Sequence, residues 1–181
     1  MKDKSSAARA ATTQTAMTTT TATGTRATTP HLLRLVDEAF DRKAWHGPNL
    51  RAATRRVTAE LALWRPGPRR HSIAEIALHA AYWKYVTRRR LRGDKRGSFP
   101  LKGSNWFAVD SLDEAGWAGV LKLLQEQHRL LRETVAGFAP GRWSSAPPGS
   151  KLRYADQVIG VAFHDIYHAG QIQTLKALQR S

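Results

Sequence analysis

The chain has 181 residues, no cysteine and a formal net charge of +15 at pH 7. Without cysteine it can form no disulfide, and a transition metal would have to be bound by His, Asp or Glu. With 41% hydrophobic residues, and with no apolar run near the roughly 18 residues of a membrane span or the shorter run of a secretory signal, the composition predicts one cytoplasmic globular domain that does not enter a membrane.

The first 30 residues consist mostly of Thr, Ala and Ser. Because they contain almost no large apolar side chain, we predict a disordered tail over residues 1–30 and a folded domain over residues 31–181. A first helix is expected from His31 until Gly47 and Pro48 break its periodicity. Residues 49–64 indicate one or two short helical pieces, which makes the connection to the next long helix longer than a hairpin needs.

A second long helix is predicted from Ser72 to about Arg92 and Gly93. Its start has a capping box, in which Ser72 and Glu75 each satisfy a free backbone N–H group. A basic cluster then extends from Arg88 to Arg96. Cations at a helix C-terminus complement the helix dipole, and this is our interpretation of the cluster; the alternative is a contact with nucleic-acid phosphates.

The remaining sequence predicts two more long helices. Residues 93–110 form a long connection whose aromatic residues indicate that it packs on the domain and borders a site. A second capping box, from Ser111 to Glu114, is expected to open the third helix, which ends near Gly137. The fourth helix is expected over residues 154–178. Four amphipathic helices without any strand predict an all-α fold, a four-helix bundle.

Two histidines interrupt the apolar stripe of the fourth helix. At 3.6 residues per turn, His164, His168 and Gln171 lie on nearly the same face, and that face is otherwise apolar and directed to the core. Imidazoles four residues apart can bind one metal ion at about 2.0–2.1 Å. Surface histidines and hydrogen-bonded core histidines are the alternatives.

A third nitrogen ligand is available in the second helix. His79 lies in its apolar middle, and helical bundles build metal sites from side chains of facing helices. His128, on the apolar stripe of the third helix, is the alternate ligand. Three neutral imidazoles leave one or two coordination positions open, which is typical of a catalytic metal site.

Four further residues are candidates for the surroundings of the site. Gln171 is expected either to orient a bound water or a substrate or to hydrogen-bond to a loop at the end of the bundle. Asp165 gives the motif a likeness to the His-Glu-x-x-His motif of zinc proteases, but its shorter side chain favours an exposed carboxylate or a supporting hydrogen-bond acceptor over a general base. Trp83 and Tyr167 are candidates for the pocket wall, and aromatic core packing is the alternative for both. The other histidines, at positions 31, 46 and 71, are given no role.

The sequence resembles the DinB/YfiT-like superfamily. The resemblance rests on the segment around His79 (residues 73–83), on His164 to Ile172, and on residues 99–106. It implies a four-helix bundle, frequent dimers, and a divalent metal ion, zinc or nickel, held by the residues that match His79, His164 and His168. It also implies that some relatives are transferases or isomerases that use a low-molecular-weight thiol, mycothiol or bacillithiol.

We therefore expect a metal-dependent enzyme of the thiol-S-transferase or isomerase type that acts on a small molecule. The ion would lower the pKa of a bound thiol or water and so produce a nucleophile near neutral pH. A metal-dependent hydrolase is the first alternative. The second is a non-enzymatic basic helical protein that binds nucleic acid through the cluster from Arg88 to Arg96, or that forms a homodimer with an idle metal site.

Overall fold

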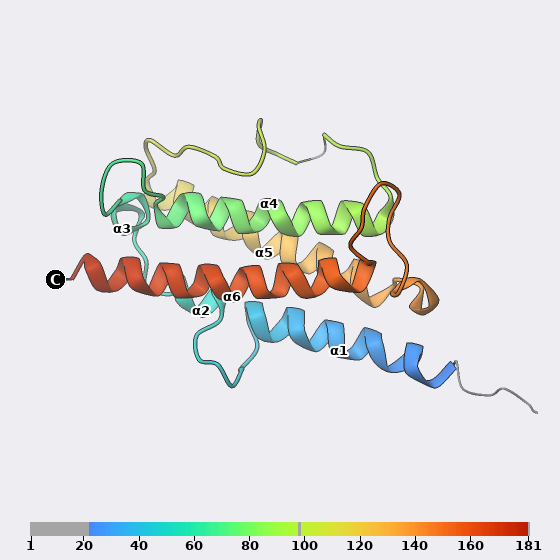
Figure 1. The fold of residues 1–181 in the computed structure, drawn as a ribbon. Helices are drawn as coiled ribbons and strands as arrows, with labels where there is room; N and C mark the ends of the chain where they lie inside the picture. The colour runs from blue at the N-terminus through green and yellow to red at the C-terminus, as the bar shows by residue number, and fades with distance from the viewer. Residues whose placement is uncertain (1–21, 98, 181) are drawn as a thin grey trace, which may run out of the picture.

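The computed structural model describes residues 22–97 and 99–180, and within these ranges every regular element is a helix (Figure 1). The predicted all-α class and four-helix bundle are therefore confirmed. The long helices are α1 (Ala22–Phe40), α4 (Ile73–Arg92), α5 (Glu114–Ala136) and α6 (Tyr154–Leu178). The short elements are α2 (Leu50–Ala53), α3 (Ala59–Leu63) and the 3-10 helix η1 (Pro140–Arg142).

The direction of the helices explains the two long connections. Figure 1 shows α4 and α6 side by side and antiparallel, with α5 behind them and α1 next to α6. Helices α4 and α5 run in the same direction, so the chain between them has to return along the length of α4. We call residues 99–113 of this return the crossover segment. The earlier connection contains α2 and α3, the short helical pieces predicted for residues 49–64.

Helix α4 has the predicted ends. Ser72 accepts a hydrogen bond from the Glu75 backbone N–H, and the Glu75 carboxylate accepts one from the Ser72 N–H, which is the predicted capping box. At the other end Gly93 has a φ of 77°, a left-handed conformation that glycine adopts without strain. Helix α6 also begins and ends at the predicted residues.

Two predicted helix starts are corrected by the structure. Helix α1 begins at Ala22 rather than His31 and contains Pro30, while the rest of the predicted tail, residues 1–21, lies outside the described part. A tertiary contact at this turn overrides the low helix propensity, since the Trp143 indole N–H donates to Thr29 Oγ1 at 2.8 Å. The N-cap of α5 is Asp113 instead of Ser111.

Glu114, the acidic residue of the capping box predicted for α5, makes a different contact. The Glu114 carboxylate accepts a hydrogen bond of 2.7 Å from the Ala59 backbone N–H at the start of α3. Glu114 therefore joins α5 to the α1–α4 connection and is not available to cap its own helix. Helix α5 is capped by the Asp113 side chain, which accepts from the Gly116 N–H at 2.7 Å.

A buried ion pair crosses the core between α4 and α6. The Lys84 ammonium donates to the Asp165 carboxylate, and the two residues are only 0% and 1% exposed. Asp165 is therefore not the exposed helix carboxylate expected from sequence. A charge inside a bundle is tolerated only when it is paired, so this contact fixes how α4 and α6 face each other. Among the described residues, no helix is long and apolar enough to cross a membrane.

Candidate metal centre

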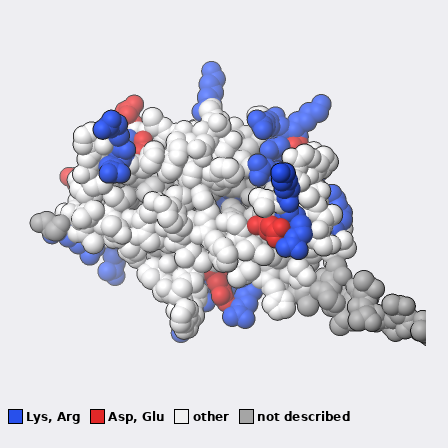
Figure 2. Space-filling view, in the orientation of Figure 1, with Lys and Arg blue, Asp and Glu red and all other residues white. Residues whose placement is uncertain are grey.

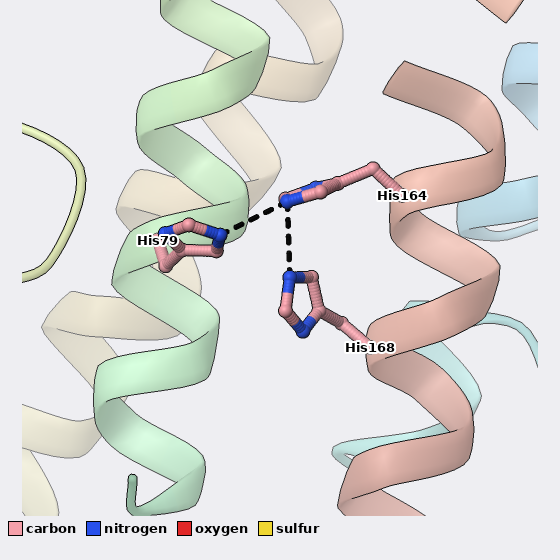
Figure 3. A group of neighbouring side chains, drawn as sticks. All are labelled: His79, His164 and His168. Atoms are coloured by element: carbon pink, nitrogen blue, oxygen red, sulfur yellow. Dashed lines mark hydrogen bonds between the residues drawn. The ribbon is translucent and has the colours of Figure 1, made fainter. Parts of the chain in front are cut away.

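His79, His164 and His168 converge on one point between α4 and α6 (Figure 3). The Nε2 atom of His164 lies 2.9 Å from that of His79 and 3.0 Å from that of His168. A tetrahedral ion with metal–nitrogen bonds of about 2.0–2.1 Å separates its ligand nitrogens by about 3.4 Å. The two His164 contacts would each have to lengthen by roughly half an ångström to admit the ion, and all three ligand nitrogens lie within 4.8 Å of one another. Among the His, Asp and Glu side chains that the structure describes, these three histidines form the group whose ligand atoms lie close enough together to hold a metal ion.

Hydrogen bonds on the far side of two rings fix which nitrogen is free. His79 Nδ1 lies 2.8 Å from the Asn105 backbone carbonyl, which can only accept, so this nitrogen carries the proton. His168 Nδ1 donates to Gln171 Oε1 at 2.6 Å, while Gln171 Nε2 donates to the Tyr167 hydroxyl. The Nε2 atoms of His79 and His168 are then bare acceptors, as metal ligands require.

The contacts among the three rings cannot all be satisfied by protons. With bare Nε2 atoms on His79 and His168, a single Nε2–H of His164 can donate to only one of them. A cation bound by the three Nε2 atoms would remove this conflict, because each atom would then direct a lone pair at the ion. His164 Nδ1 would carry the proton in that state; among the described residues it is buried without a hydrogen-bond partner, which costs about 1–3 kcal/mol.

The histidines are in the protonation state that binds metal. Burial lowers the pKa of His79, and it lowers the pKa of His164 to about 3 and that of His168 to about 4. Repulsion between neighbouring rings lowers the pKa values of His164 and His168 further, because a protonated imidazole would be a cation beside another one. At neutral pH all three imidazoles are uncharged and offer a lone pair.

The crossover segment supports the site. Trp106 stacks on the His79 ring with centroids 3.8 Å apart, and Asn105 accepts from both the His79 ring and the Trp83 indole N–H. The sequence indicated that this connection borders a site, but it did not single out Asn105 or Trp106 as site residues. The sequence feature that could have pointed to them is the pair Asn105 and Trp106 itself, a polar and an aromatic residue at the end of residues 99–106.

A cavity of about 940 Å³ lies beside the three nitrogens. It is lined by all three histidines, by Tyr167 and Gln171, and by residues near the N-terminal end of α4 and the C-terminal end of α6. These further residues are Pro66, Arg69, Arg70, His71, Ile76, Trp106, Gly170, Thr174, Leu175 and Leu178. Because ligand pockets typically have volumes of about 300–1,000 Å³, this cavity can accept a small molecule in contact with a metal ion.

The remaining predicted site residues occupy different positions. Trp83 does not line this cavity, but its ring meets those of His79 and His164 edge-on. Asp165 contacts Lys84 rather than a site histidine. His128, the alternate ligand, stacks on Phe40 with centroids 3.9 Å apart, lines a separate cavity of about 500 Å³ and does not join the group.

The basic cluster lies at the C-terminal end of α4. Arg92 Nε pairs with the Asp94 carboxylate at 2.7 Å, and an Arg89 N–H donates to the Asp94 carbonyl. Figure 2 shows that Lys and Arg gather toward the two ends of the face on which α4 and α6 lie, while the middle of that face is mainly uncharged. The cluster is thus separate from the three histidines and complements the helix end.

The fold and the site define a class, helical-bundle proteins with an open cluster of histidines suited to a divalent metal ion. A family model described as the DinB superfamily matches residues 42–172, so the chain belongs to that superfamily. The matched residues contain all three histidines and the crossover segment. The comparisons with curated proteins and with solved structures gave no match.

Proposed function

We propose that this protein binds one zinc or nickel ion through His79, His164 and His168 and is an enzyme of the thiol-S-transferase or isomerase type. The convergence of three Nε2 atoms, 2.9 and 3.0 Å apart along the two His164 contacts, carries the proposal. Membership of the DinB superfamily supports it, because the resemblance of the sequence to that family implies a metal at these positions.

The residues around the ion have distinct tasks. The Asn105 carbonyl and the Gln171 amide hold the rings of His79 and His168 with Nε2 toward the ion. Three protein ligands leave a position that faces the cavity, and there a bound ion would lower the pKa of a thiol or a water. The choice of a thiol rests on the family resemblance, and a hydrolase that uses water is the alternative.

Metal content tests the first part of the proposal. Protein purified without a histidine tag should contain close to one equivalent of transition metal after reconstitution, and His164→Ala should lose most of it. His46 is exposed and far from the group in sequence, which makes His46→Ala the matched control. Less than about a tenth of an equivalent in the reconstituted wild type would refute the metal site.

Cobalt substitution separates the thiol from the hydrolytic mechanism. A thiol that binds the open position should add a sulfur-to-metal charge-transfer band to the spectrum of the Co²⁺ protein, and the band should be absent in His164→Ala. Transfer of that thiol to a panel of electrophiles would then establish the reaction class. Metal-dependent ester or amide hydrolysis without a thiol band would favour the hydrolase.

Two other expectations stay predictions. A homodimer would be detected by light scattering of the purified protein. The cytoplasmic location would be tested by fractionating cells that produce the full chain.

A further inference from the structure

The connection between α3 and α4, residues 64–72, places positive charge at the rim of the histidine cavity. Arg69 and Arg70 both line this cavity, and both side chains are exposed. Arg69 has a φ of 60°, a left-handed conformation that is uncommon outside glycine. The Arg70 backbone N–H closes the turn by donating to the Gly67 carbonyl at 3.3 Å. Strained backbone of this kind is concentrated at binding sites.

A single buried carboxylate fixes both ends of this connection. Glu75 accepts from the Arg65 guanidinium at 2.7 Å and from the Ser72 backbone N–H at 3.0 Å, and it lies 3.4 Å from His71 Nδ1. The Arg65 guanidinium lowers the pKa of Glu75 despite its burial, so the carboxylate is charged and its charge is matched by Arg65. Glu75 therefore positions the backbone that carries Arg69 and Arg70, while its own charge is paired with Arg65.

The connection is also joined to the metal centre by stacked rings. The His71 ring lies 3.5 Å from the Trp106 ring at an interplanar angle of 2°, and Trp106 stacks in turn on His79. The arginine-bearing turn therefore has a defined position relative to the metal ligands. Its charges are presented to the same cavity as the open coordination position.

The cavity lining has the character of a site for an organic anion. Among the residues that the structure describes, the lining contains two arginines and no Asp or Glu, and its walls include the apolar side chains of Ile76, Leu175 and Trp106. Guanidinium groups bind carboxylate and phosphate oxygens through paired N–H donors. An apolar wall beside them favours a ligand with a hydrocarbon or aromatic part.

We propose that the substrate of this site is an amphipathic organic anion whose carboxylate or phosphate is bound by Arg69 and Arg70 while its apolar part lies against Ile76 and Leu175. The inference rests on the proposed function for the role of the ion, but the anion contact itself requires no metal. The arginines select and position the substrate, and the metal centre faces its reactive part.

The proposal is tested by measuring the binding of 4-phenylbutyrate by calorimetry. The uncharged 4-phenylbutanamide, which has the same apolar part, is measured for comparison. The proteins are the metal-loaded wild type, Arg69→Gln/Arg70→Gln, and the control Arg89→Gln/Arg90→Gln, which removes the same charge at the other end of α4. We expect the double change at the cavity to raise the Kd of the carboxylate by about tenfold or more and to leave that of the amide unchanged. The control should stay within about twofold of the wild type.

Three results would overturn the proposal. They are no carboxylate binding by the wild type up to about 10 mM, an equal Kd in the wild type and the cavity variant, or an equal loss in the control variant. The same titrations in a His164→Ala background separate the two proposals. An arginine effect that persists there supports the anion site even if no metal is bound, whereas an effect that disappears with the metal shows that the arginines do not bind the anion themselves and overturns it.

Discussion

The indole of Trp106 lies parallel to the imidazole of His79, with ring centroids 3.8 Å apart and an interplanar angle of 8°. Trp106 comes from the crossover segment and His79 from the middle of α4, so the contact joins a loop to a metal-ligand candidate. The indole also stacks on the His71 ring. These two contacts fix the indole, and the fixed indole restricts the rotation of the His79 ring, so that its Nε2 atom is directed to the other two histidines.

Replacing Trp106 should therefore weaken both the fold and the metal site. We expect Trp106→Ala to lower the free energy of unfolding by about 2–3 kcal/mol, since an aromatic side chain that packs on two rings is lost. Metal affinity, measured by competition with a chelator, should fall about tenfold. Trp106→Phe keeps a stacking ring and should retain most of both. Wild-type metal affinity in Trp106→Ala would show that the indole does not position His79.

The hydrogen bond from His168 to Gln171 gives a second prediction. Gln171→Ala leaves His168 Nδ1 without its acceptor, so the ring can rotate or change tautomer, and we expect metal affinity to fall by about 10–100-fold. The effect on unfolding should be small, because Gln171 is only partly buried. Gln125→Ala, on the exposed side of α5, is the control. Equal chelator competition curves for the two variants would contradict the role of Gln171.

The buried pair of Lys84 and Asp165 gives a prediction on stability. Lys84→Met leaves the Asp165 carboxylate without its cation inside the core, and we expect the free energy of unfolding in urea to fall by about 3–5 kcal/mol. The double variant Lys84→Met/Asp165→Leu removes both charges and should recover most of the loss, because apolar groups of similar volume can replace a buried pair. A double variant less stable than Lys84→Met would disprove this account.

His128 makes the stability dependent on pH. Burial, together with the nearby charge of Lys84, lowers its pKa to about 2, whereas an unfolded histidine titrates near 6.5. Below pH 6.5 the unfolded chain binds a proton that the folded chain rejects, so acid favours unfolding. From pH 7 to 4.5 the wild type should lose stability more steeply than His128→Phe, by up to about 1.4 kcal/mol per pH unit. Parallel stability profiles for the two proteins would contradict the shift.

The sequence contained enough to predict the three histidines and the helices that hold them. Spacing of three and four residues places His164, His168 and Gln171 on one face whatever the rest of the chain does. His79 was found because it lies in the middle of an apolar helix that has to pack near the other two histidines, and helical bundles build metal sites from facing helices. The same periodicity placed α6 correctly from its first to its last residue.

Residues outside the helices could not be found in this way. Asn105 and Trp106 reach the site because α4 and α5 are parallel and the chain between them returns along α4, and helical periodicity does not reveal the direction of a neighbouring helix. His71 reaches it from the connection that precedes α4, through its contact with Trp106. Asp165 was predicted to be an exposed carboxylate or a supporting hydrogen-bond acceptor, and its contact with Lys84 shows why it can be buried. The early start of α1 likewise depends on a contact between Thr29 and Trp143, which are distant in sequence.

The separation of the site histidines along the chain has a consequence for the order of events in folding. His79 and His164 are 85 positions apart, and the crossover segment that supports His79 lies between them. Closing so large a loop is entropically unfavourable and slow, so the three nitrogens meet only after α6 has docked on α4. We therefore expect metal to be captured late, by a chain that is already nearly native, and the rate of metal uptake during refolding to report on that docking step.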